Sequence, residues 1–163
     1  MFGHPEGFRV EVVWDEQRSL WCGHTVLDAD GRVEVAITAG DIGPELARSY
    51  AALTLSQLAP RTADARRYAA RKLAEYYNYF HAHLPDGEQV TAEEFASRLR
   101  LEGVRLRNEG DARLDFGHDL YRSGGQYAGG LVVVEADAGG KFRRAYWVTE
   151  PDAQEARRTR RCT

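Results

Sequence analysis

Residues 63–83 read ADARRYAARKLAEYYNYFHAH and predict one long amphipathic helix in the middle of the chain. Apolar side chains recur there at helical spacing and form one stripe of Ala69, Leu73, Tyr76, Tyr77 and Phe80. Charged side chains cover most of the remaining surface, namely Arg66, Arg67, Arg71, Lys72 and Glu75. The other predicted elements are arranged around this helix.

Two further helices are predicted next to it. Pro44 suits the first position of a helix that Pro60 ends. Thr91-Ala92-Glu93-Glu94 matches the capping-box pattern, in which a threonine hydroxyl and a glutamate carboxylate satisfy the first amides of a short helix. The helices are therefore expected to lie together in the middle of the sequence.

Strands are predicted on both sides of the helices, because apolar and polar residues alternate there. The N-terminal strands are expected at 8–14, 19–27 and 32–38, and the C-terminal strands near 104–106, 112–116, 131–134 and 142–148. Grouped helices favour an α+β fold over a parallel wound fold. We expect an antiparallel sheet of N-terminal and C-terminal strands, packed against two or three central helices.

The loop at residues 28–31 decides which side chains of the first predicted hairpin face the core. A loop of two or four residues places Leu20, Cys22, His24 and Val26 on the same face as Val33, Val35 and Ile37. A loop of three residues exposes the first set instead. We expect Cys22 and His24 to face inward as a structural pair, since two ligands fall short of a zinc site.

Residues 1–150 are predicted to form one domain, and residues 151–163 a basic, disordered tail. The N-terminal residues lack the pattern of a secretory signal, which favours a cytoplasmic location. In such a reducing compartment Cys22 and Cys162 are expected to be free thiols. No apolar run approaches the ~20 residues of a membrane helix.

The formal net charge of −3 argues against a nucleic-acid-binding domain. The exception is the basic segment Arg157–Arg161, which could make weak phosphate contacts. The glycine-rich residues 124–130 lack the lysine of a phosphate-binding loop, so they are interpreted as a hairpin loop. We expect no cofactor and no metal.

The stretch LDFGHDL, residues 114–120, holds the candidate catalytic residues His118, Asp115 and Asp119. A histidine beside a carboxylate can act as a general base when the two groups converge. In a regular strand His118 faces one side and both aspartates the other, so convergence requires a bulge at Gly117. The competing interpretation is a structural histidine at the edge of the core.

Tyrosine and tryptophan are numerous in the long helix and in the last strands, and these residue types are enriched in protein interfaces. The candidate binding residues are Tyr79, His81, His118, Tyr121 and Tyr127. Most of the other aromatic residues are expected to lie in the core. Together, these residues predict a surface that binds another protein.

Four short motifs resemble a bacterial family of small domains of unknown function: Trp21-Cys22-Gly23, residues 31–37, residues 73–78 and Phe116-Gly117-His118. The resemblance covers roughly residues 8 to 148. Some members of such families are immunity proteins encoded near polymorphic toxins, which implies a protein-binding inhibitor. We therefore expect a non-enzymatic protein-binding module; the alternative is a small hydrolase or metal-dependent enzyme centred on His118. The oligomeric state is left open.

Overall fold

The structure is a computed structural model that describes residues 10–27, 30–38, 42–81, 89–107, 110–120 and 129–162. Within these residues, seven strands form one sheet in chain order, from β1 to β7. The strands are β1 (Glu11–Asp15), β2 (Leu20–Leu27), β3 (Gly31–Thr38), β4 (Leu99–Arg107), β5 (Ala112–His118), β6 (Leu131–Ala136) and β7 (Phe142–Val148). The helices are α1 (Pro44–Leu58), the 3-10 turn η1 (Ala59–Arg61), α2 (Thr62–His81), α3 (Ala92–Ser97) and α4 (Glu150–Arg160).

Neighbouring strands are antiparallel except for β3 and β4, which pair in parallel. The mixed α+β class is therefore confirmed, whereas a wholly antiparallel sheet is wrong at this one pair. The reason is the connection: the chain leaves β3, passes through α1, α2 and α3, and enters β4 in the same direction.

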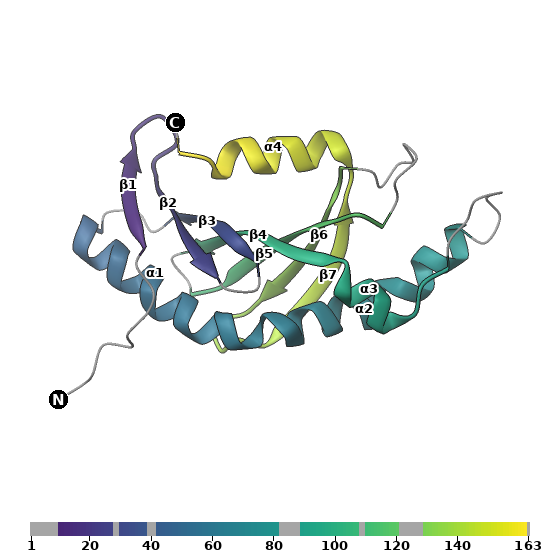
Figure 1. Cartoon of the computed structure of the whole chain (residues 1–163). Coiled ribbons are helices and arrows are strands. Elements are labelled where there is room, and N and C mark those ends of the chain that lie inside the picture. The colour runs from purple at the N-terminus through teal and green to yellow at the C-terminus, as the bar shows by residue number, and fades with distance from the viewer. Residues whose placement is uncertain are drawn as a thin grey trace.

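The main core lies between the sheet and the helices α1 and α2, which run along one face (Figure 1). Small side chains of these helices let them approach the sheet, among them the fully buried Ala47, Ala51, Ala65 and Ala69. The predicted stripe of α2 is partly wrong, because Tyr76 and Phe80 are exposed, whereas the alanines at 65, 70 and 74 are buried. The capping box is confirmed: Glu94 N donates to Thr91 Oγ1 at 3.1 Å, and Thr91 N donates to Glu94 Oε2 at 2.8 Å.

The opposite face of the sheet is covered by α4 (Figure 1). Ala153 and Ala156 of this helix pack against Leu131 and Val133 of β6. The prediction of a disordered tail from residue 151 onward is therefore wrong, since the segment folds as a helix. Its buried stripe consists of two alanines and Arg160, which hydropathy does not distinguish from a polar tail.

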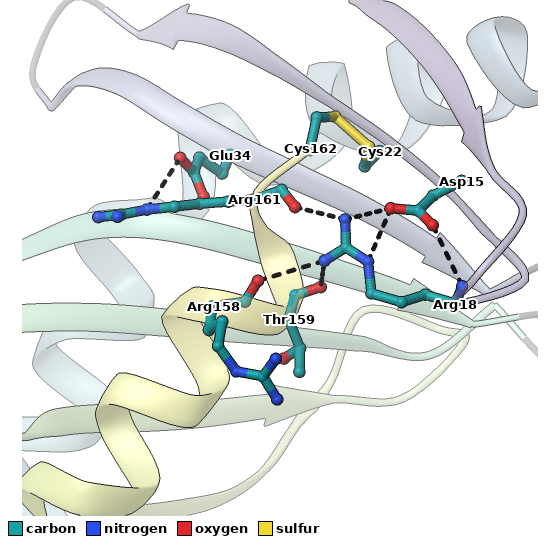
Figure 2. Close-up of a disulfide and its surroundings, with 8 residues drawn as sticks. All are labelled: Asp15, Arg18, Cys22, Glu34, Arg158, Thr159, Arg161 and Cys162. Carbon is teal, nitrogen blue, oxygen red and sulfur yellow. Dashed lines mark hydrogen bonds and ion pairs between the residues drawn. A yellow bond between two sulfur atoms is a disulfide. The ribbon is translucent and has the colours of Figure 1, made fainter.

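The end of α4 is joined to β2 by a disulfide between Cys22 and Cys162, whose Cα atoms are 5.6 Å apart (Figure 2). The prediction of two free thiols is wrong. Cys22 lies on the face that α4 covers, and α4 returns the end of the chain to this position. The two cysteines are 140 positions apart, so the bond encloses most of the sequence.

The register of the first hairpin explains why Cys22 faces α4. Leu27 pairs with Gly31, so the loop contains three residues, and Cys22 pairs with Ala36. The expected inward orientation of His24 is therefore wrong, because the three-residue loop turns this side chain to solvent. Among the helices that the structure describes, none is long and apolar enough to cross a bilayer.

Candidate functional site

His118 and Asp115 lie on opposite faces of the sheet. The pairing of β5 with β6 is regular from Ala112 to Gly117, and the irregularity lies instead in β4, between Leu101 and Gly103. His118 contacts the ring of Trp147 edge to face, with 5.1 Å between the ring centroids. The bulge that would bring the two side chains together is absent from the described part of β5.

Burial lowers the pKa of His118 from 6.5 to about 4, and the positive charge of Arg157 adds to this shift. Asp119 acts in the opposite direction through its negative charge. Neither ring nitrogen of His118 has a hydrogen-bond partner among the described residues. The imidazole is therefore neutral at pH 7 and packs as an aromatic side chain.

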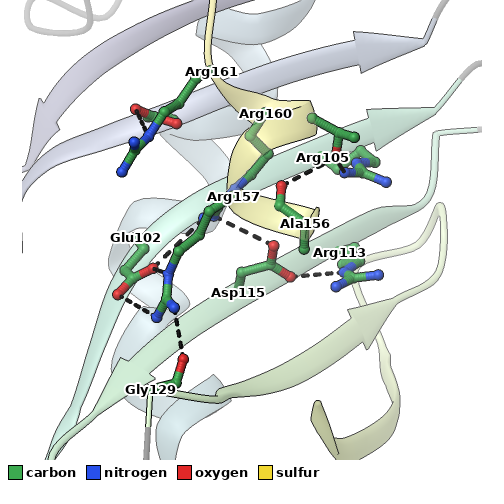
Figure 3. A network of polar contacts seen from close by, with 11 residues as sticks. Glu102, Arg105, Arg113, Asp115, Gly129, Ala156, Arg157, Arg160 and Arg161 are labelled. Carbon is green, nitrogen blue, oxygen red and sulfur yellow. Dashed lines mark hydrogen bonds and ion pairs between the residues drawn. The ribbon is translucent and has the colours of Figure 1, made fainter. Parts of the chain in front are cut away.

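Asp115 belongs to a polar network beneath α4 (Figure 3). Arg113 Nε donates to Asp115 Oδ1 at 2.7 Å, and Arg160 Nη1 lies 3.3 Å from Asp115 Oδ2. Only 2% of the Arg160 side chain is exposed. Asp115 is thus a structural counter-ion for two arginines and is not available as a partner for His118.

Gly103 and Gly117 make room for this network. A Cβ atom on Gly103 would lie 1.8 Å from Arg160 Nη1, and one on Gly117 would lie 2.1 Å from Glu102 Oε1. Gly117 therefore serves close packing of a charged side chain and does not introduce a bulge.

The arginines predicted to form a basic tail are engaged within the fold. Arg157 Nε donates to Glu102 Oε2 at 2.9 Å, and its Nη1 donates to the carbonyl of Gly129 at 2.6 Å. Arg158 pairs with Glu155 in the same helix. Weak phosphate contact through Arg157–Arg161 was predicted for a free tail, which these residues do not form.

The end of α2 carries three exposed aromatic side chains, which we call the aromatic surface: Tyr76, Tyr79 and Phe80. Their exposed fractions are 50%, 68% and 41%. The ring of Phe80 lies 4.5 Å from that of Tyr76 and 5.6 Å from that of Tyr79, measured between centroids. This end of α2 projects beyond the strands of the sheet (Figure 1).

Two neighbouring residues anchor the aromatic surface to the core. Tyr77 is buried, and its hydroxyl donates a hydrogen bond to the carbonyl of Leu120. The amide of Asn78 binds the backbone of Val90 twice, donating to its carbonyl at 2.7 Å and accepting from its N–H at 2.8 Å. The exposed rings are therefore carried on a helix end that is fixed from its inner side.

The other candidate binding residues have different positions. His118 is largely buried, and His81 is the last residue of α2. Tyr121 and Tyr127 lie outside the described residues. Nowhere in the described ranges do histidine, cysteine, aspartate or glutamate side chains form a group that could hold a metal ion.

Comparison of the chain with protein-family models, with curated proteins and with solved structures found no match.

Proposed function

We propose that this protein is a non-enzymatic protein-binding module and that the aromatic surface of α2 is part of its binding site. The observation that carries the proposal is the grouping of three exposed aromatic rings at the anchored end of one helix. Aromatic side chains dominate the energetically important centres of protein interfaces. Exposed rings that already contact one another lose little conformational freedom when a partner binds.

The partner class comes from the family resemblance, which implies an immunity-type inhibitor of a bacterial toxin. A net charge of −3 gives mild electrostatic attraction to a basic partner such as a nuclease. Tyr79 is the candidate binding residue with the strongest support, because it is the most exposed ring of the aromatic surface. The assignments of His81, Tyr121 and Tyr127 stay predictions.

The alternative, a small hydrolase or metal-dependent enzyme centred on His118, has less support. A general base must reach its partner and must be unprotonated near neutral pH. His118 meets the second condition, but Asp115 is on the other face of the sheet and is held by Arg113 and Arg160. The geometry therefore favours binding over catalysis.

A cytoplasmic location stays a prediction. The disulfide between Cys22 and Cys162 bears on it, because structural disulfides persist mainly in oxidising compartments. The redox state of the two thiols in intact cells is the measurement that decides between the compartments.

The test uses the tagged full-length protein to isolate a stoichiometric partner, followed by binding measurements with the purified pair. We expect Tyr79→Ala and Phe80→Ala to weaken binding by about tenfold or more, as interface centres do. Leu53→Ala is the matched control, because Leu53 is an exposed large apolar residue on α1. Unchanged affinity of both aromatic variants would remove the aromatic surface from the site, and His118-dependent hydrolysis without a partner would favour the enzyme.

A further inference from the structure

Two arginines lie directly opposite one another on the face of the sheet beneath α4. Arg105 of β4 pairs in register with Arg113 of β5. Side chains at such positions are close neighbours, and like charges placed there repel one another. Figure 3 shows both guanidinium groups beside Ala156 of α4, on the side away from Glu102.

The two arginines differ in how their charge is compensated. Arg113 is paired with Asp115 at 2.7 Å, and it lies opposite Glu135 of β6. Arg105 Nη2 donates to the hydroxyl of Thr159 at 3.0 Å and makes no ion pair with any carboxylate that the structure describes. Burial lowers the pKa of Arg105, and the positive charge of Arg113 lowers it further, whereas the negative charge of Asp115 acts in the opposite direction. Asp115 is itself bound by Arg113 and lies beside Arg160, so one carboxylate faces several guanidinium groups and Arg105 forms no ion pair of its own among the described residues.

A cavity of about 590 Å³ opens beside these arginines, between α4 and the end of β7. Its lining includes Arg105, Arg113, Tyr146, Val148, Ala156 and Thr159. Two acidic residues of α4, Asp152 and Glu155, also border it, and Glu155 is already held by Arg158. The volume lies within the range of small-molecule sites, and the lining is mixed, with Val148 and Ala156 as apolar side chains among mostly polar ones.

We propose that this cavity binds a small organic anion, with one carboxylate or phosphate group held by Arg105 and Arg113 and an apolar portion against Tyr146 and Val148. Guanidinium groups bind both anions through paired hydrogen bonds, which a hydroxyl partner alone does not replace. An anion here also removes the repulsion between the two arginines. The site is separate from the aromatic surface, so it does not depend on the proposed protein partner.

The experiment measures binding of phenyl phosphate and of benzoate to the oxidised full-length protein by isothermal titration calorimetry. Phenol is the uncharged control. We expect saturable binding of at least one anion and none of phenol, and the tighter anion identifies the acidic group. Arg105→Gln should weaken binding by about tenfold or more, the effect of losing a charged hydrogen-bonding partner.

Arg107→Gln is the matched control, because Arg107 is an exposed arginine two positions along the same strand and outside the cavity lining. It should leave the affinity within about twofold, as expected for a surface charge. Arg105→Lys retains the charge but not the fork of donors, so it should give an intermediate loss. If Arg105→Gln does not fold, the affinity of Arg105→Lys tests the proposal in its place.

The thermal midpoints separate a binding role from a structural one. If Arg105 serves an anion, Arg105→Gln without ligand should be at least as stable as the wild type, because the like-charge contact is removed. A lower midpoint together with unchanged anion affinity would make Arg105 a structural residue and overturn the proposal. Failure of both anions to bind the wild type at millimolar concentration would overturn it as well.

Discussion

At the scale of single residues, His118 illustrates what alternation along a strand can predict. The period of two correctly separates it from Asp115, and the structure places the two on opposite faces. The sequence does not reveal that Trp147 covers the ring, because this contact joins residues 29 positions apart. Nor does it reveal that Gly117 makes room for Glu102, since that depends on a bulge in the neighbouring strand β4.

The buried neutral state of His118 predicts a loss of stability in acid. Its pKa is about 4 in the folded protein, below the ordinary value of 6.5, so the unfolded chain takes up a proton first as the pH falls. The stability that this group contributes is complete above about pH 6.5 and is lost towards pH 4, which amounts to about 2–3 kcal/mol.

His118→Phe should keep the ring contact with Trp147 and remove this titration. Urea unfolding at about pH 7 and about pH 4.5 should show a difference that is smaller in the variant by about 2–3 kcal/mol. His24→Gln is the control, because His24 is an exposed histidine on β2. An equal acid sensitivity of His118→Phe and the wild type would show that His118 is not the responsible group.

At the scale of elements, the sequence predicts those whose signal is local. The long helix, the capping box at Thr91 and most strands follow from apolar spacing and from the residues that begin and end them. The sequence does not predict helix α4, because its buried residues are Ala153, Ala156 and Arg160, which do not form an apolar stripe. Their burial is seen only in the folded protein, where the helix packs on the sheet. The parallel pairing of β3 and β4 was missed because it depends on how the helices reconnect the strands.

The C-terminal end of α4 depends on Arg18, which follows β1 (Figure 2). Arg18 is paired with Asp15 and donates to the carbonyls of Arg158, at 3.2 Å, and of Thr159, at 2.6 Å. It also donates to the carbonyl of Arg161. The last carbonyls of a helix have no partner within the helix, and a cation there opposes the partial negative charge of the helix end.

Arg18→Ala should therefore lower the free energy of unfolding by about 1–3 kcal/mol. It should also speed amide hydrogen exchange in α4 more than in α2. Arg67→Ala is a suitable control, because Arg67 forms an exposed ion pair with Asp64 and should cost less than about 0.5 kcal/mol. Equal exchange in α4 for both variants would mean that Arg18 does not hold this helix.

At the scale of the whole molecule, α4 and its disulfide join the C-terminal end of the chain to β2. Because the bond joins residues 140 positions apart, it restricts the unfolded chain strongly, and its loss should lower the free energy of unfolding by about 2–4 kcal/mol. For a protein of 163 residues this corresponds to a fall of roughly 5–15 °C in the melting temperature.

The measurement compares thermal unfolding of the wild type with and without dithiothreitol, alongside the double variant Cys22→Ser/Cys162→Ser. The reduced wild type and the double variant should melt at similar temperatures, and the reductant should not affect the variant. Cys22 is only 1% exposed whereas Cys162 is exposed, so thiol labelling after reduction should modify Cys162 first. Two thiols that react in the untreated protein, or a melting temperature that reductant leaves unchanged, would contradict a stabilising disulfide. An equal fall in the reduced wild type and in the double variant would instead show that the bond between α4 and β2 stabilises the fold.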